Sequence, residues 1–130
     1  MNIKSFMALI VILMVPNAYS DDHSSRKKGS LMSYCVQITY DNKVKNNCYK
    51  EVTYKIAPSG GEYTKDYPLK GLYTFHGSGM SNLAKGSEKK DPLLEVIQRN
   101  GKQVRMIACE VGFTPYFSDF SAFTGVCLQN

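Results

Sequence analysis

The chain has 130 residues, with 16 lysines and arginines against 11 aspartates and glutamates, a formal net charge of +5. This length excludes several separate hydrophobic cores. The moderate positive charge permits RNA or an acidic surface as partner but requires neither. With two histidines and no CxxC pair, we expect no metal site and no other cofactor.

Residues 1–20 have the pattern of a secretory signal peptide. Lys4 precedes ten apolar residues, Phe6 to Val15, and Ala18-Tyr19-Ser20 supplies small residues for cleavage. Ten residues form a helix of roughly 15 Å, about half of what spans a bilayer, so we expect no membrane anchor. The mature chain would begin at Asp21 and carry 15 basic and 11 acidic residues, a net charge of +4.

The mature chain is expected to begin with a flexible polar arm, residues 21–32, followed by one domain, residues 33–130. Residues 33–40 alternate in the manner of a half-buried strand. One face would carry Tyr34, Val36, Ile38 and Tyr40.

Residues 43–56 are expected to form an amphipathic helix. Apolar residues recur there every four positions, and Asp41 and Asn42 are suitable N-cap residues before them. Pro58 to Gly61 would end the helix. The residues of the apolar stripe are Val44, Cys48, Val52 and Ile56.

The second half of the chain is expected to be mainly strands, with a strand at 71–77, a polar loop at 78–91, an aromatic-rich loop at 112–121 and a last strand at 122–128. Asn100-Gly101 lies between two apolar runs, 93–98 and 103–111, and predicts a central hairpin in which Ile97 faces Val104 and Leu94 faces Ile107. The expected fold is α+β, one helix packed on a central antiparallel sheet.

Four cysteines in a small secreted chain indicate two disulfides, for which three connectivities are possible. The expected topology favours Cys35–Cys127, between the first and last strands, and Cys48–Cys109, between helix and sheet. The alternative is that Cys48 or Cys109 is a free buried thiol.

The order of these features is similar to that of a known family. A leader, a strand with a cysteine, a helix, Tyr67-Pro68, an Asn-Gly hairpin and Phe123-x-x-x-Cys127 resemble the small fungal guanyl-specific ribonucleases. They resemble more closely the ribonuclease-like secreted effectors of cereal powdery mildew fungi, which include avirulence proteins. The family's Tyr-x-Cys reads Ser33-Tyr34-Cys35 here.

This resemblance covers most of residues 34–127 and implies a microbial ribonuclease fold. It also implies delivery into a host plant cell, binding of host protein or RNA, and recognition by a plant immune receptor.

Active ribonucleases of this fold need a base, an acid and a cation for the phosphorane charge. The family's histidine after Tyr-Pro is replaced by Leu69, and no histidine follows His76. In one alignment register Glu110 takes the position of the acid histidine; in the other, Glu95 and Arg105 match the catalytic Glu and Arg. Neither register supplies the base, the acid and the cation together, so we expect that the protein is not an enzyme. The alternative is a divergent ribonuclease using Glu95, Arg105 and His76.

Single residues have structural alternatives. The structural interpretation is favoured for both catalytic candidates: His76 is a strand-end residue, and Glu95 is an edge residue paired with a lysine. Two aromatic groups are candidate binding surfaces, for stacking RNA bases or for binding protein, with core packing as the alternative. They are Tyr63, Tyr67, Lys70 and Tyr73, and Phe113, Tyr116, Phe117 and Phe120.

The sequence therefore predicts a secreted, non-catalytic, monomeric effector that binds host protein or RNA. An active ribonuclease and an extracellular disulfide-stapled toxin or inhibitor are the alternatives.

Overall fold

The computed structural model describes residues 25–59, 63–65, 71–75, 79–119 and 124–129. The predicted leader and four candidate site residues lie outside these ranges, namely Tyr67, Lys70, His76 and Phe120. The described part contains a short 3₁₀ helix, one α-helix and a set of strands. The helices are η3 (Ser33–Cys35) and α2 (Pro92–Arg99). The strands are β1 (Val36–Ile38), β2 (Lys43–Asn46), β3 (Val52–Pro58), β4 (Tyr63–Lys65), β5 (Tyr73–Phe75), β6 (Met80–Leu83), β7 (Glu88–Lys90), β8 (Val104–Glu110), β9 (Phe113–Phe117) and β10 (Gly125–Gln129).

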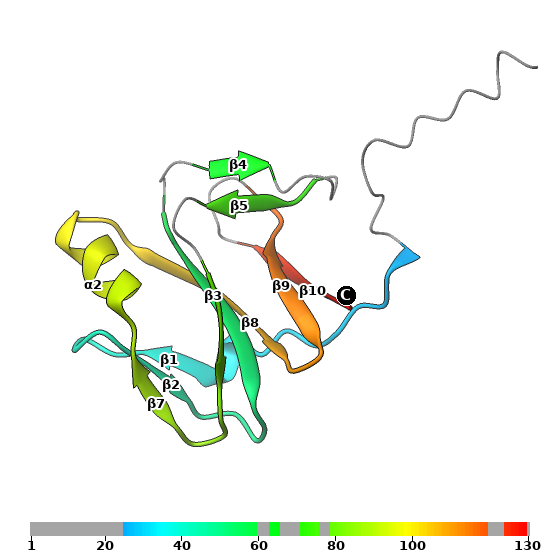
Figure 1. Ribbon diagram of the computed structural model, residues 1–130, viewed down its shortest axis with the longest axis horizontal. Coiled ribbons are helices and arrows are strands. Elements are labelled where there is room, and N and C mark those ends of the chain that lie inside the picture. The colour runs from blue at the N-terminus through cyan, green and yellow to red at the C-terminus, as the bar shows by residue number, and fades with distance from the viewer. Residues whose placement is uncertain (1–24, 60–62, 66–70, 76–78, 120–123, 130) are drawn as a thin grey trace, which may run out of the picture.

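The strands form three antiparallel sheets with the orders β1-β2-β7, β6-β3-β8 and β10-β9-β5-β4. Strands β3 and β8 run through the middle of the molecule (Figure 1). Helix α2 and the β1-β2-β7 sheet lie on one side of them, and β9 and β10 lie on the other. The described residues therefore form an α+β fold with one α-helix, as predicted, although this helix is elsewhere in the chain.

The β3–β8 pair is buried on both faces, because each face of a strand receives alternate residues. One face carries Tyr54 and Ile56 of β3 and packs against Leu94 and Ile97 of α2. The other face forms a second cluster, in which the rings of Phe75 and Phe117 meet edge to face with centroids 5.1 Å apart. The second cluster comprises Ala57, Phe75, Ile107, Cys109, Phe117 and Cys127.

The predicted helix at 43–56 is wrong, because this segment forms β2 and β3 with a connection between them. The apolar spacing of four that indicated a helix is also a multiple of two, so the same residues share one face of a strand. Val44 and Asn46 are buried in β2, and Val52, Tyr54 and Ile56 continue the alternation in β3.

The predicted hairpin at Asn100-Gly101 is also wrong. Residues 92–99 form α2, whose N-cap Asp91 accepts a hydrogen bond from the Leu93 amide at 3.0 Å. At the other end Gly101 has φ 71°, and the amides of Gly101 and Lys102 donate to the carbonyls of Gln98 and Ile97. This is a helix-terminating Schellman motif, which needs the same positive φ that a hairpin turn needs. Ile97 and Leu94 accordingly pack from the helix rather than facing Val104 and Ile107 across a hairpin.

The other predicted elements agree in part. Strands β5, β8 and β10 lie within or close to the predicted strands 71–77, 103–111 and 122–128. The predicted strand at 33–40 is η3 followed by the three residues of β1, and the two predicted loops contain β6, β7 and β9.

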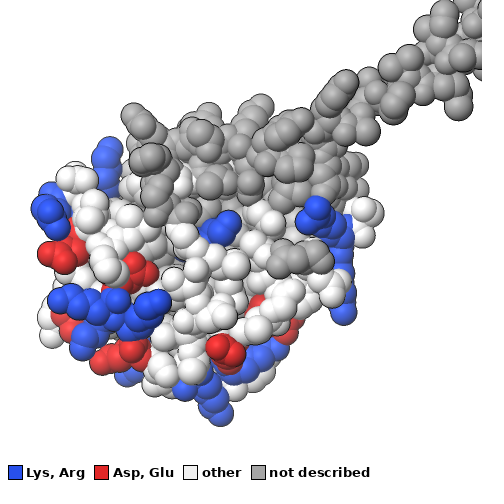
Figure 2. Space-filling model, viewed as in Figure 1, with Lys and Arg blue, Asp and Glu red and all other residues white. Residues whose placement is uncertain are grey.

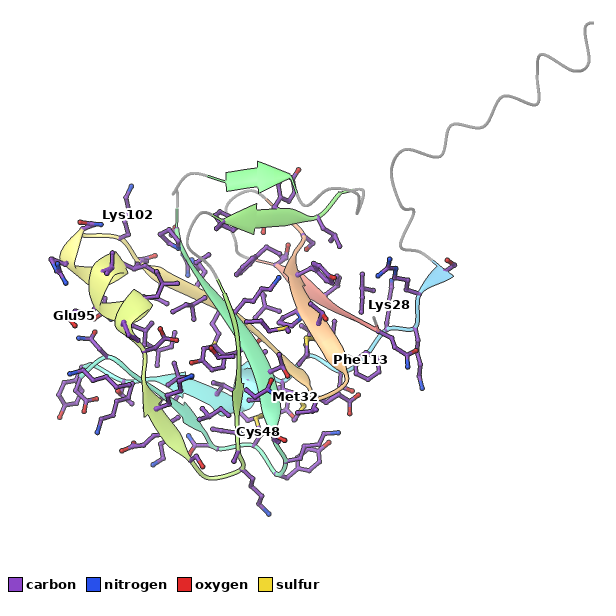
Figure 3. The ribbon with its side chains drawn as sticks, in the orientation of Figure 1. Lys28, Met32, Cys48, Glu95, Lys102 and Phe113 are labelled. Carbon is purple, nitrogen blue, oxygen red and sulfur yellow. A yellow bond between two sulfur atoms is a disulfide. The ribbon has the colours of Figure 1, made fainter. Side chains whose placement is uncertain are left out.

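Both predicted disulfide pairings, Cys35–Cys127 and Cys48–Cys109, are wrong. The bonds are Cys35–Cys48 and Cys109–Cys127, with Cα atoms 5.0 and 5.7 Å apart. The β1–β2 register pairs Val36 with Asn46, which brings Cys35 beside the connection that holds Cys48. The second bond ties β8 to β10, and therefore one sheet to another (Figure 3). The predicted pairing failed because it rested on a helix that does not exist.

The described part of the predicted arm, residues 21–32, is bound to the domain from Lys27 onward. The Gly29 amide donates to the Cys127 carbonyl at 2.9 Å, and the Met32 amide donates to the Ala108 carbonyl at 2.7 Å. Met32 is 1% exposed and joins the core (Figure 3). This segment therefore lines the edges of β10 and β8 and differs from the flexible arm that its composition indicated.

Candidate binding groove

The structure does not bring the two main catalytic candidates together. Glu95 lies in the first turn of α2, exposed, with a carboxylate oxygen 3.6 Å from Arg99 (Figure 3). Arg105 lies on β8 two residues before Ile107, which belongs to the cluster on the face away from α2. Strand alternation puts Arg105 on that same face, where its guanidinium donates to Gln103 Oε1 at 2.9 Å. Glu95 and Arg105 are thus on opposite sides of the central sheet.

The third candidate, Glu110, ends β8 in an ion pair with Lys50. The hydrogen bond from Lys50 lowers the pKa of the Glu110 carboxyl, and the same bond raises the pKa of Lys50. The Lys50 ammonium also lies 5.3 Å from the centre of the Tyr49 ring. A carboxyl with a lowered pKa holds no proton at neutral pH, so this arrangement suits a structural ion pair and does not suit a general acid.

Most of the described aromatic candidates belong to the core. Phe117 is 1% exposed, and Phe113 and Tyr73 pack against its cluster. Tyr116 packs with Leu72 and Leu128, and its ring centre lies 4.9 Å from the Lys55 ammonium. Tyr63 lies in β4.

The described aromatics that face solvent are ones that sequence reasoning missed. Tyr34 is 77% exposed, Tyr40 98% and Tyr49 65%. The strand predicted for 33–40 placed Tyr34 and Tyr40 on one face together with Val36 and Ile38, and it did not single them out as exposed. The sequence signal that was available is Asp41-Asn42, which are turn residues as well as cap residues.

An apolar groove of about 460 Å³ opens beside Tyr34. Leu31, Ser33 and Tyr34 line it from the N-terminal segment, and Met106 and Ile107 line it from β8. Thr124 and Gly125 line it at the start of β10. None of these seven residues is charged. Leu31, 45% exposed, adds to the apolar surface.

Tyr34 is held by both of its neighbours. Ser33 Oγ accepts a hydrogen bond from the Ala108 amide at 3.0 Å, and Cys35 is bonded to Cys48. The residue between these two anchors sits in η3 with its ring in solvent. A large side chain presented from a fixed backbone loses little entropy on binding, which is typical of residues that dominate protein interfaces.

Gly125 keeps β10 and β8 close beside the groove. A Cβ atom at this position would lie 2.5 Å from Ile107 Cδ1 and 2.7 Å from the Tyr116 carbonyl oxygen. The preceding residue, Thr124, is fixed by Asp119, which accepts hydrogen bonds from its amide at 2.9 Å and its hydroxyl at 3.2 Å.

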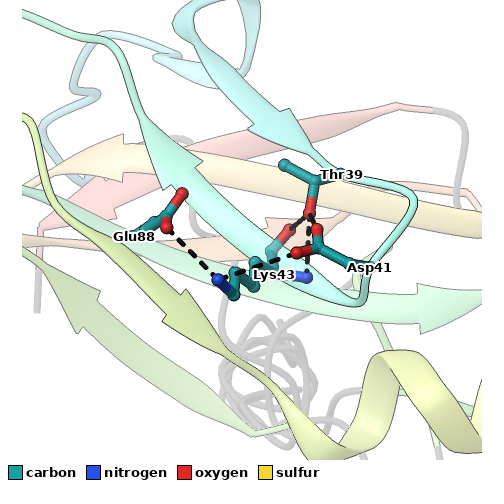
Figure 4. Close-up of polar contacts among 4 residues, drawn as sticks. All are labelled: Thr39, Asp41, Lys43 and Glu88. Atoms are coloured by element: carbon teal, nitrogen blue, oxygen red, sulfur yellow. Dashed lines mark hydrogen bonds and ion pairs between the residues drawn. The ribbon is translucent and has the colours of Figure 1, made fainter.

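The second exposed tyrosine, Tyr40, lies at the tip of the β1–β2 hairpin. Asn42 has φ 64°, and its amide donates to the Thr39 carbonyl, the arrangement of a three-residue hairpin loop. The Thr39 hydroxyl bonds Asp41 and lowers the pKa of that carboxyl, while Lys43 reaches Glu88 at 3.3 Å (Figure 4).

Charges of both signs alternate over the corner formed by β1, β2 and β7 (Figure 2). The β2–β7 register places Lys43 opposite Lys90 and Lys45 opposite Glu88. A nucleic-acid surface usually presents a field of positive charge, and this corner is mixed.

No protein-family model, no curated protein and no solved structure matches this chain. Among the described residues, no helix has the length and apolar composition needed to cross a membrane. The same residues contain no group of three or more His, Cys, Asp or Glu side chains placed to hold a metal ion.

Proposed function

We propose that this protein is a secreted, non-catalytic binding protein whose partner is another protein and whose contact surface is the groove at Tyr34. The observation that carries the proposal is the groove itself, an uncharged apolar depression beside a tyrosine fixed by a disulfide and a hydrogen bond. Aromatic anchors beside apolar pockets are the usual centre of protein–protein contacts.

Secretion is supported by the leader pattern at residues 1–20 and by the two disulfides. Disulfides form and persist in oxidising compartments, which a secreted chain passes through.

A binding role is supported over catalysis by the placement of the acidic and basic candidates. Glu95 and Arg105 lie on opposite sides of the sheet, Glu110 is paired with Lys50, and an apolar cluster packs on the sheet face away from α2. RNA is the less favoured partner because the described candidates Tyr73, Tyr116, Phe113 and Phe117 pack in clusters.

The ribonuclease-like scaffold and the effector role belong to the proposal through the resemblance in sequence order. In that form, the protein enters a host plant cell, binds a host protein there and is recognised by an immune receptor.

The experiment compares three oxidised mature proteins, namely the wild type, Tyr34→Ala and Tyr40→Ala. Each is immobilised, exposed to cereal leaf extract and analysed by quantitative mass spectrometry. The two exposed tyrosines make the variants a matched pair. We expect a host protein retained by the wild type and Tyr40→Ala but reduced about tenfold or more by Tyr34→Ala, as for a hot-spot residue.

The same loss must be reproduced by titration with the purified candidate. Equal retention by all three proteins would contradict the proposal. So would hydrolysis of a fluorescent oligoribonucleotide that Glu95→Gln abolishes.

A further inference from the structure

The outer edge of β8 carries main-chain groups that point away from the sheet. The Ala108 carbonyl accepts from the Met32 amide at 2.7 Å, and the Ala108 amide donates to Ser33 Oγ at 3.0 Å. Both groups therefore face the N-terminal segment and not β3, although Ala108 is directly opposite Tyr54. In an antiparallel pair such residues alternate with residues that bond across the ladder.

Met106 is two residues from Ala108, opposite Ile56, so its amide and carbonyl point to the same outer edge. Val104 is opposite Pro58, so its main-chain amide and carbonyl also point to the outer edge. The N-terminal segment turns into η3 at Ser33 and does not continue along this edge. In the described part of the chain, no strand pairs with β8 on this side. Met106 also lines the groove.

We propose that the groove binds an extended peptide segment of the partner protein, which adds as a strand to the edge of β8 at Val104–Met106. This inference rests on the proposed function and names the form in which the partner is recognised. The chain already uses this edge in the same way, because Met32 and Ser33 occupy the stretch at Ala108. Strand addition takes its affinity from main-chain hydrogen bonds and its specificity from pockets for alternate side chains.

The surroundings define the peptide. The apolar groove accepts an aliphatic side chain. Two basic residues lie where β8 begins: Lys102, two residues before the strand (Figure 3), and Arg105, its second residue. A segment that alternates aliphatic and acidic residues matches both features.

The test uses the oxidised mature protein with ¹⁵N label. The probes are seven-residue peptides in which valine or leucine alternates with aspartate or glutamate. Controls are peptides with lysine in place of the acidic residues, and peptides N-methylated at each backbone position in turn. Binding is followed by NMR titration, and amide hydrogen exchange is measured at Met106, with Ala108 as an internal reference because its amide is already bonded.

Strand addition predicts that an acidic peptide slows exchange at Met106 about tenfold or more and leaves Ala108 unchanged. It also predicts that N-methylation at alternate positions weakens binding by about three- to tenfold or more, the value of a single hydrogen bond, and that lysine peptides bind more weakly.

Binding that perturbs Tyr34 without protecting the Met106 amide, or equal affinity of all N-methylated peptides, would overturn strand addition and leave the proposed function standing. Protection of Met106 that rises with protein concentration without peptide would overturn it in favour of a second copy. Failure of every acidic peptide to bind would also overturn it, whereas the proposed function is judged separately by the Tyr34-dependent retention of a host protein.

Discussion

The substitution Asn46→Asp provides the sharpest test of how the connection between β2 and β3 is held. Asn46 is completely buried. Its Nδ2 donates to the carbonyls of Lys50 and Leu83 at 3.0 and 2.9 Å, and its Oδ1 accepts from the Cys48 amide at 2.8 Å. The side-chain amide of Asn46 thus satisfies main-chain groups of the turn that carries Cys48, and it joins this turn to the end of β6.

Aspartate has almost the same shape as asparagine, but it replaces the Nδ2 donor with an oxygen. The carbonyls of Lys50 and Leu83 would then lose their hydrogen-bond donor. An unsatisfied buried acceptor costs about 1–3 kcal/mol, so two of them cost about 2–6 kcal/mol at neutral pH. This is a large part of the roughly 5–15 kcal/mol that stabilises a small domain.

The penalty should depend on pH. The folded environment disfavours the ionised form of the introduced carboxyl, so its folded pKa lies above the unfolded value of about 3.9. A carboxyl whose pKa is raised in the folded state lowers the free energy of unfolding least below its unfolded pKa and most above its folded pKa. The variant should therefore approach the wild type as pH falls toward about 3, where a protonated carboxyl can donate to one of the two carbonyls.

The assay is urea unfolding followed by far-ultraviolet circular dichroism, since the chain has no tryptophan. Asn47→Asp is the matched control, because Asn47 is the exposed neighbour and should change stability by less than about 0.5 kcal/mol. A stability of Asn46→Asp within about 0.5 kcal/mol of the wild type at pH 7 would refute the reasoning, because its magnitude comes directly from the burial and the two donated bonds.

Two further variants test the disulfide pairing and the ion pair at the end of β8. Peptide mapping without reduction should find Cys35 linked to Cys48, and the Cys35→Ser/Cys48→Ser protein should lose about 2–4 kcal/mol in urea unfolding; a fragment linking Cys35 to Cys127 would contradict the fold. Because Lys50 lowers the pKa of Glu110 below its ordinary 4.5, this pair stabilises the fold above that value and the stabilisation disappears as pH falls through the folded pKa. Glu110→Gln should therefore be less stable than the wild type at pH 7 and equal to it near pH 2, measured as urea midpoints, and a difference that persists at pH 2 would show that the ion pair is not its cause.

The sequence was informative where a local pattern allowed one interpretation. The apolar run at residues 103–111 predicted β8, and the fold class followed from one helix among many strands. Where two structures share a pattern, the prediction failed. An apolar spacing of four suits a helix and also one face of a strand, so residues 43–56 were assigned to the wrong class.

The Asn100-Gly101 error has the same origin. Positive φ at Gly101 ends a helix as readily as it turns a hairpin. The cap that decides between them is Asp91 followed by Pro92, eight residues and more upstream, where the polar run 78–91 was assigned to a loop. The disulfide pairing failed with the helix predicted at 43–56, because that helix placed Cys48 against the sheet that carries Cys109.

The groove could not be predicted from sequence, because its residues come from three separated segments, 31–34, 106–107 and 124–125. Their proximity depends on the N-terminal segment running along β8, for which the polar composition of residues 21–30 gives no signal. The exposed position of Tyr34 likewise depends on η3, a single turn with no characteristic pattern.

Buried and covalent contacts surround the segment that carries Tyr34 on the wall of the groove. Met32, just before η3, is buried and hydrogen-bonded to β8, and Cys35, the last residue of η3, is disulfide-bonded to Cys48. Cys48 in turn is held by the buried Asn46. A catalytic site would need such rigidity around acid and base groups, yet Glu95 is exposed on a helix and Glu110 is in an ion pair. Rigidity placed behind an exposed tyrosine and an apolar groove reduces the entropy lost on association, and this is the requirement of a binding surface.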